Sequence, residues 1–245
     1  MSTSARPNPQ STQRPNPSEL PDEVQEALNT NYEWKDDTMM LVCTSYVPDH
    51  PAYGMTFDEY KKNRVDFMSP SDVEKISLSF RLPPLLSQIS TDTAYDYNLS
   101  YYKFLTMIIE IGMIYLQQDY HEEYSIASDY RTAAKNDIKT EQHLAIYEQI
   151  RKQTITIDVS IPRTVPPTHP MVVEWLANAA TEYSNHLNMG KTEFINLCWA
   201  MGVVKSKPKN IPDPILVRCE NMIKKFEIEL KMYCDRIVYL RDQIK

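Results

Sequence analysis

The fold of this chain is decided by the nine residues Lys75–Pro83, which read KISLSFRLP. Apolar and polar side chains alternate strictly along this stretch. The apolar members are Ile76, Leu78, Phe80 and Leu82, and the polar members are Lys75, Ser77, Ser79 and Arg81. A period of two predicts a strand with one buried face, and Pro83-Pro84 ends it because proline lacks a backbone N–H.

Two helices are predicted after this strand. A weakly helical stretch runs to Tyr97, and Asn98 follows at a position suited to the left-handed conformation, which asparagine tolerates. Ser100 can cap the next helix, which runs from Tyr101 to about Gln118. This helix has apolar residues on all of its faces, so we expect it to be deeply buried.

A similar succession returns in the second half of the chain. Ile155, Ile157, Val159 and Ile161 alternate with Thr154, Thr156, Asp158 and Ser160, and Pro162 follows. This alternation predicts a second strand. A helix is expected from about Met171 to Leu187, then Asn188, then a second apolar helix.

The two halves match at one offset. Asn98, Phe104, Leu105, Ile111 and Gly112 fall 90 positions before Asn188, Phe194, Ile195, Met201 and Gly202. The prolines Pro83 and Pro162 are only 79 apart, so the second copy needs eleven extra residues (90 − 79), which we assign mostly to the loop Arg163–Pro170. The repeat predicts two strand–helix–helix units, at residues 71–118 and 153–207.

Each unit resembles the ribbon-helix-helix family of DNA-binding domains. In the first unit, Lys75–Pro83 is similar to the family's ribbon strand, Asn98-Leu99-Ser100 to its turn between helices, and Phe104-Leu105 to the apolar pair of its second helix. In the second unit the connection from strand to helix is longer than the family pattern. The resemblance covers roughly 45 residues in the first unit and roughly 50 in the second.

The resemblance implies a mainly α fold with short β-strands, in which the two units form an intramolecular pseudo-dimer and pair their strands into a ribbon for the major groove. The implied base-reading residues are Ser77, Ser79, Arg81, Thr156, Asp158 and Ser160. The implied phosphate-clamping residues, at the helix N-termini, are Ser100, Tyr101, Tyr102, Gly190, Lys191 and Thr192. Asp158 departs from the pattern, because its carboxylate would repel nearby phosphates.

Composition argues against most enzyme classes and gives no support to nucleic-acid binding. The four glycines are scattered, so no phosphate-cradling loop is present, and the five histidines have no ligand at metal spacing. We therefore expect no catalytic residues, no metal, no cofactor and no small-molecule substrate. The formal net charge of −7 is unfavourable for binding to a duplex, whose affinity usually comes from Lys and Arg.

The remaining segments have simpler interpretations. Residues 1–22 are rich in Ser and Pro and are expected to be disordered, and residues 23–70 form an extension with a strand near Met39–Cys43 and a short helix. Residues 119–152 are expected to be a helical linker. No membrane-spanning run or secretory signal is recognised, which predicts a soluble protein, either cytoplasmic and nucleoid-associated or, if viral, inside the host cell.

The C-terminal segment 212–245 is predicted to be one long helix with a coiled-coil pattern. Its apolar seam includes Leu216, Ile223, Phe226, Leu230, Tyr233, Ile237 and Leu240. Two arrangements fit this seam: self-association between chains, which its length favours, or packing onto the chain's own domain.

The sequence favours a non-enzymatic regulator that binds double-stranded DNA sequence-specifically. Two alternatives stay open. One is a structural or assembly protein, such as a viral nucleocapsid or coat subunit, and the other is a protein-interaction adaptor built on the same duplicated core.

Overall fold

The computed structural model describes residues 32–35, 40–43, 50–67, 75–137, 140–157, 159, 161 and 164–243, so the tail predicted to be disordered, residues 1–22, lies outside it. The chain divides into two units, residues 1–44 and 45–245. In the first unit, β1 (Tyr32–Lys35) pairs antiparallel with β2 (Met40–Cys43), and Tyr32 lies opposite Cys43. The strand predicted near Met39–Cys43 is therefore confirmed.

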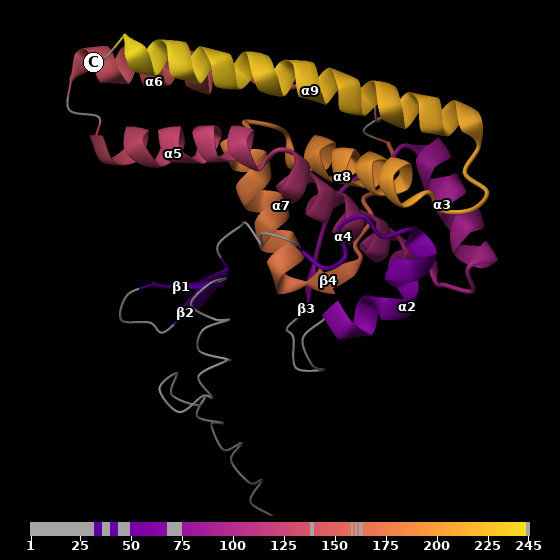
Figure 1. Ribbon diagram of the computed structural model, residues 1–245. Coiled ribbons are helices and arrows are strands. Elements are labelled where there is room, and N and C mark those ends of the chain that lie inside the picture. The colour runs from indigo at the N-terminus through magenta and orange to yellow at the C-terminus, as the bar shows by residue number, and fades with distance from the viewer. Residues whose placement is uncertain are drawn as a thin grey trace, which may run out of the picture. The chain divides into compact units, whose positions relative to one another are not determined.

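The second unit is mostly helical with short strands, which confirms the predicted mainly α composition of the fold. Its elements are α2 (Phe57–Phe67), β3 (Lys75–Ser77), α3 (Pro84–Asp96), α4 (Tyr101–Asp119), α5 (His121–Asp137), α6 (Glu141–Arg151), β4 (Met171–Val173), α7 (Glu174–His186), α8 (Lys191–Ser206) and α9 (Asp213–Asp242). Figure 1 shows α9 along the outer edge of this unit, with α5 and α8 on its inner side.

The two strands of this unit pair antiparallel into a ribbon. Lys75 lies opposite Val173 and Ser77 opposite Met171. The pairing continues past β3, because the Phe80 and Thr168 backbones exchange two hydrogen bonds, with N···O distances of 3.1 and 2.7 Å. Burial follows the predicted alternation: Leu78, Phe80 and Leu82 face the core, and Lys75, Ser77, Ser79 and Arg81 are exposed.

The second strand predicted at residues 154–161 is wrong. The described residues of that stretch form no strand, and the partner of β3 lies further on, at residues 168–173. Ile155 and Ile157 are nevertheless buried, while Thr154 and Thr156 are exposed. The predicted loop Arg163–Pro170 therefore contains part of the ribbon.

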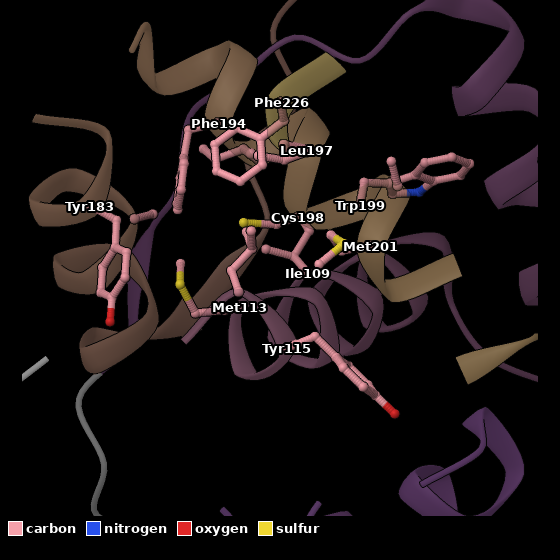
Figure 2. Close-up of a cluster of buried hydrophobic side chains, with 14 of the residues drawn as sticks. Ile109, Met113, Tyr115, Tyr183, Phe194, Leu197, Cys198, Trp199, Met201 and Phe226 are labelled. Atoms are coloured by element: carbon pink, nitrogen blue, oxygen red, sulfur yellow. The ribbon is translucent and has the colours of Figure 1, made fainter. Parts of the chain in front are cut away.

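Two long helices, α4 and α8, form the centre of the core. All of their residues from Phe104 to Gln117 and from Phe194 to Val203 are buried. Figure 2 shows Ile109 and Met113 of α4 close to Cys198 and Met201 of α8. The deep burial predicted for the 101–118 helix is confirmed, and the helix that covers it belongs to the same chain.

Both predicted asparagine turns are present. Asn98, between α3 and α4, has φ of 52°, and Asn188, between α7 and α8, has φ of 53°. Both values lie in the left-handed region, which asparagine occupies more readily than most residues. The predicted cap is also present, since the Ser100 side chain accepts a hydrogen bond from the Lys103 N–H.

The apolar seam of α9 packs inside the unit, against α5, α6 and α8. Phe226, Leu230, Tyr233, Ile237 and Leu240 are all nearly inaccessible to solvent. Ile223 is buried too, and Leu216 is half-buried. The sequence favours self-association between chains through this seam. The structure instead shows the seam packed onto the chain's own domain, because helices of the same chain cover these side chains.

The segment before the ribbon is fixed to α4 by a buried polar cluster. The Glu110 carboxylate of α4 is fully buried and accepts two hydrogen bonds from the Arg64 guanidinium of α2, both at 2.9 Å. The Tyr60 hydroxyl donates a third, at 2.9 Å. Burial, together with the adjacent carboxylate, raises the pKa of Tyr60, so its proton stays in place to make this bond.

Across the described residues, no single helix is both long and apolar enough to span a membrane. The helices α3 and α4 pass that test only when they are taken together, and they are bent by 104° at the break between them.

Candidate nucleic-acid interface

The outer face of the ribbon is the candidate site. Both strands expose alternate side chains on this face, since neighbouring residues of a strand point to opposite sides. From the first strand these are Lys75, Ser77, Ser79 and Arg81, and from the second they are Pro167, His169 and Met171. The first strand thus offers two cations and two hydroxyls, while the second offers an imidazole and two apolar side chains.

Arg81 is held on this face by two contacts with the second half of the chain. Its Nε donates a hydrogen bond to the Val165 carbonyl oxygen, at 3.0 Å. Its own carbonyl oxygen accepts a hydrogen bond from Nδ2 of the buried Asn196 on α8, at 2.9 Å. The Nε contact leaves the two terminal NH2 groups as the fork that can donate to two acceptors in one plane.

The structure separates the six predicted base-reading residues. Ser77, Ser79 and Arg81 lie together on the ribbon's outer face, as expected. Thr156 is exposed, but it lies in an irregular segment outside the ribbon, and Asp158 and Ser160 lie outside the described residues.

Sequence reasoning missed Pro167, His169 and Met171. One signal could have found them. The 90-residue offset that relates Asn98 to Asn188 also relates Ser77, Ser79 and Arg81 to these three positions, without any gap.

The N-terminus of α4 carries the first set of predicted phosphate-clamping residues, Ser100, Tyr101 and Tyr102. Ser100 and Tyr102 are exposed, while Tyr101 is half-buried, with its hydroxyl 2.9 Å from that of Ser87. The first turn holds no acidic residue and includes the exposed Lys103. The positive end of the helix dipole is therefore reinforced by a cation here.

The N-terminus of α8 carries the second set, Gly190, Lys191 and Thr192, and its electrostatics differ. Glu193 lies in its first turn, and its carboxylate accepts a hydrogen bond from the Gly190 N–H at 3.3 Å. A carboxylate at this place satisfies a donor that an incoming phosphate would need. Of the two helix starts, α4 is thus the better placed for an anion.

The described residues show no other chemistry at this face. They contain no group of three or more His, Cys, Asp or Glu side chains that could hold a metal ion. Cys198, Cys219 and Cys234 are free thiols buried elsewhere in the core. Burial raises the pKa of Cys219 and of Cys234 to about 12, which disfavours the reactive thiolate.

Comparison with known proteins adds no family to these observations: no protein-family model, no curated protein and no solved structure matches the chain.

Proposed function

We propose that the chain is a sequence-specific double-stranded DNA-binding protein, whose β3–β4 ribbon enters the major groove as a tandem ribbon-helix-helix module. The observation that carries this proposal is the antiparallel pairing of β3 with β4, each of which is followed along the chain by a similar pair of helices. A two-stranded ribbon fits the major groove, where outward side chains reach base edges.

The pairing supports an internal twofold relation between the two strand–helix–helix repeats, at residues 71–118 and 153–207. The helices α3 and α7 begin at residues 84 and 174, and α4 and α8 at residues 101 and 191, so both pairs are 90 residues apart. In a twofold arrangement, each residue of one strand has a counterpart 90 positions away on the other strand. The counterpart of Phe80 is Pro170 and that of Thr168 is Leu78, so a Pro170–Leu78 pair is expected beside the Phe80–Thr168 pair. The Leu78 N–H does donate to the Pro170 carbonyl oxygen, at 3.0 Å.

The same offset makes the proposed DNA site asymmetric. Arg81 in one half corresponds to Met171 in the other, and Lys103 at the start of α4 corresponds to Glu193 at the start of α8. Arginine pairs best with guanine O6 and N7, whereas an apolar side chain suits the thymine methyl group. We therefore expect a non-palindromic target with guanine in the half that Arg81 contacts.

The acidic net charge is compatible with this function if few phosphates are contacted. The repeat at residues 71–118 contains three cationic side chains, Lys75, Arg81 and Lys103, and all three are exposed. A small number of phosphate contacts gives a shallow dependence of affinity on salt, so base contacts have to supply much of the selectivity. Such a regulator would act in the compartment that holds the DNA, a cytoplasm with a nucleoid or an infected host cell.

The direct test is selection of bound sequences from a random duplex library, followed by binding measurements on the selected duplex over a range of salt. We expect Arg81→Ala to weaken specific binding by about 1–3 kcal/mol, the cost of losing one bidentate base contact. Arg241→Ala, at an exposed position of α9, is the control and should bind normally. Absence of duplex binding contradicts the proposal, and preference for single-stranded RNA with growth of oligomers supports an assembly protein instead.

The asymmetry has its own test in Met171→Arg, which gives both strands the same reading residue. This variant should shift the selected sequence toward a palindrome with guanine in both halves. If the wild type itself selects a palindrome, the asymmetric assignment is wrong, although DNA binding stands.

A further inference from the structure

The long helix α9 carries a second apolar stripe, on the side opposite its buried seam. Four side chains form it, all more than half exposed: Val217 (53%), Ile228 (62%), Met232 (63%) and Tyr239 (55%). At 3.6 residues per turn, their spacings of 11, 4 and 7 residues place them within roughly 60° of arc. Large exposed apolar side chains that line up in this way are typical of an interaction surface.

Charged residues lie on the same stripe in a definite order. Lys224 lies one turn before Ile228, and Asp235 lies one turn after Met232, both exposed. The stripe therefore has a cation toward one end, an anion toward the other and an apolar centre. Its two ends are complementary to each other.

We propose that this stripe binds the same stripe of a second copy of the chain, with the two α9 helices antiparallel. A twofold axis near position 230 would put Ile228 against the partner's Met232, and Met232 against the partner's Ile228. A symmetric interface of this kind uses one patch twice, so the patch has to be self-complementary.

The charges decide the direction of the second helix. In an antiparallel pair, Lys224 lies within one residue of the level of the partner's Asp235, and Asp235 within one residue of the partner's Lys224, which gives two pairs of opposite charge. In a parallel pair in register, each of these residues would lie opposite its own copy, with like charges in contact. Like charges across an interface suppress association, so the antiparallel arrangement is favoured.

The next pair outward fits the same arrangement. Asn221 falls opposite the partner's Tyr239, which places an amide near a phenol hydroxyl. The coiled-coil seam takes no part, because it is already covered by α5, α6 and α8. This interface is independent of DNA binding and would join two ribbons in one assembly.

The test is the mass of the full chain in solution, measured by sedimentation equilibrium over a range of concentrations. We expect the wild type to reach twice the chain mass of 28.6 kDa, and Ile228→Glu/Met232→Glu to remain at one chain mass. Tyr95→Glu, which changes an 82%-exposed residue of α3, is the matched control and should dimerise normally. A wild type that stays monomeric at all concentrations overturns the proposal, as does a control that also dissociates.

A charge exchange tests the direction of the helices. Lys224→Glu alone and Asp235→Lys alone should each weaken the dimer about tenfold, because each replaces two attractive pairs by two repulsive ones. The double variant Lys224→Glu/Asp235→Lys restores both pairs and should dimerise like the wild type. Failure of the double variant to recover overturns the antiparallel arrangement, and circular dichroism confirms that each variant is folded.

Discussion

Gly112 of α4 and Gly202 of α8 each lie against the backbone carbonyl of the residue four positions before the other. A Cβ at Gly112 would collide with the Cys198 oxygen, and a Cβ at Gly202 would collide with the Ile108 oxygen. The two helices approach so closely that only a hydrogen fits at either position. The contact is reciprocal, which ties the two halves of the core together at a single crossing.

The first prediction is that adding one methyl group at this crossing destabilises the fold. Gly112→Ala forces two backbones apart, since neither obstructing atom belongs to a flexible side chain, and should cost about 3 kcal/mol or more. Gly202→Ala should behave alike because the contact is reciprocal. The measurement is urea unfolding, with Asn178→Ala on the exposed side of α7 as the control. If Gly112→Ala is as stable as the control variant, the α4 and α8 backbones do not approach each other this closely.

The second prediction concerns the buried carboxylate of Glu110. Arg64→Ala leaves this carboxylate without its cation, and we expect a loss of about 3–5 kcal/mol. Removing both charges in Arg64→Ala/Glu110→Ala should cost less than Arg64→Ala alone, because no unpaired charge remains in the core. The position 90 residues after Glu110 is Ala200, which is also fully buried, so alanine is a reasonable replacement. A double variant less stable than the single one would contradict this reasoning.

A third prediction separates packing within the chain from packing between chains. Phe226→Ala removes a fully buried ring from the seam of α9 and should lower the free energy of unfolding by about 3–5 kcal/mol. Because the seam is covered by the same chain, this loss should not depend on protein concentration. Arg218→Ala, an exposed position of the same helix, should change stability by less than about 0.5 kcal/mol. A loss that grows on dilution would indicate a seam shared between chains.

The fourth prediction is a loss of stability at high pH that comes from buried thiols. In the unfolded chain cysteines ionise around pH 9, whereas in the folded chain Cys219 and Cys234 keep their protons until about pH 12. The unfolded state therefore binds fewer protons between these values, and stability falls as pH rises from 9 to 12.

Denaturant unfolding at several pH values checks this effect, with Cys219→Ser/Cys234→Ser as the comparison. In a Cys43→Ser background, the same thiols should react with a thiol reagent only as fast as the core opens. Rapid labelling of the folded protein would contradict their burial.

Much of the fold could be predicted from local patterns. The alternation in Lys75–Pro83, the turns at Asn98 and Asn188 and the cap at Ser100 were recognisable because each depends on a few neighbouring residues. The first half of the candidate site followed from the same alternation, which exposes Ser77, Ser79 and Arg81.

The second strand of the ribbon, β4, could not be recognised in the same way, because the residues just before it are rich in proline. Residues 166, 167 and 170 are prolines, which are typical of loops. In the ribbon, Pro170 contributes only its carbonyl oxygen, to the Leu78 N–H, so the missing proton does not prevent this bond. The better alternation, at Ile155–Ile161, belongs to a segment whose described residues form no strand, although Ile155 and Ile157 are buried.

The seam of α9 illustrates a different limit. Apolar residues spaced alternately three and four apart predict that one face of the helix is buried. The residues that bury this face are far away in the sequence. Only the tertiary structure distinguishes α5, α6 and α8 from a second chain.

The pairing of β3 with β4 within one chain has a consequence for how the ribbon forms. Ribbons assembled from two separate chains fall apart on dilution, because their formation is a second-order event. Here the strands are joined by the intervening helices, so closing the ribbon is a first-order step whose equilibrium is the same at any concentration. The fraction of chains with a formed ribbon should therefore be the same at low and at high protein concentration.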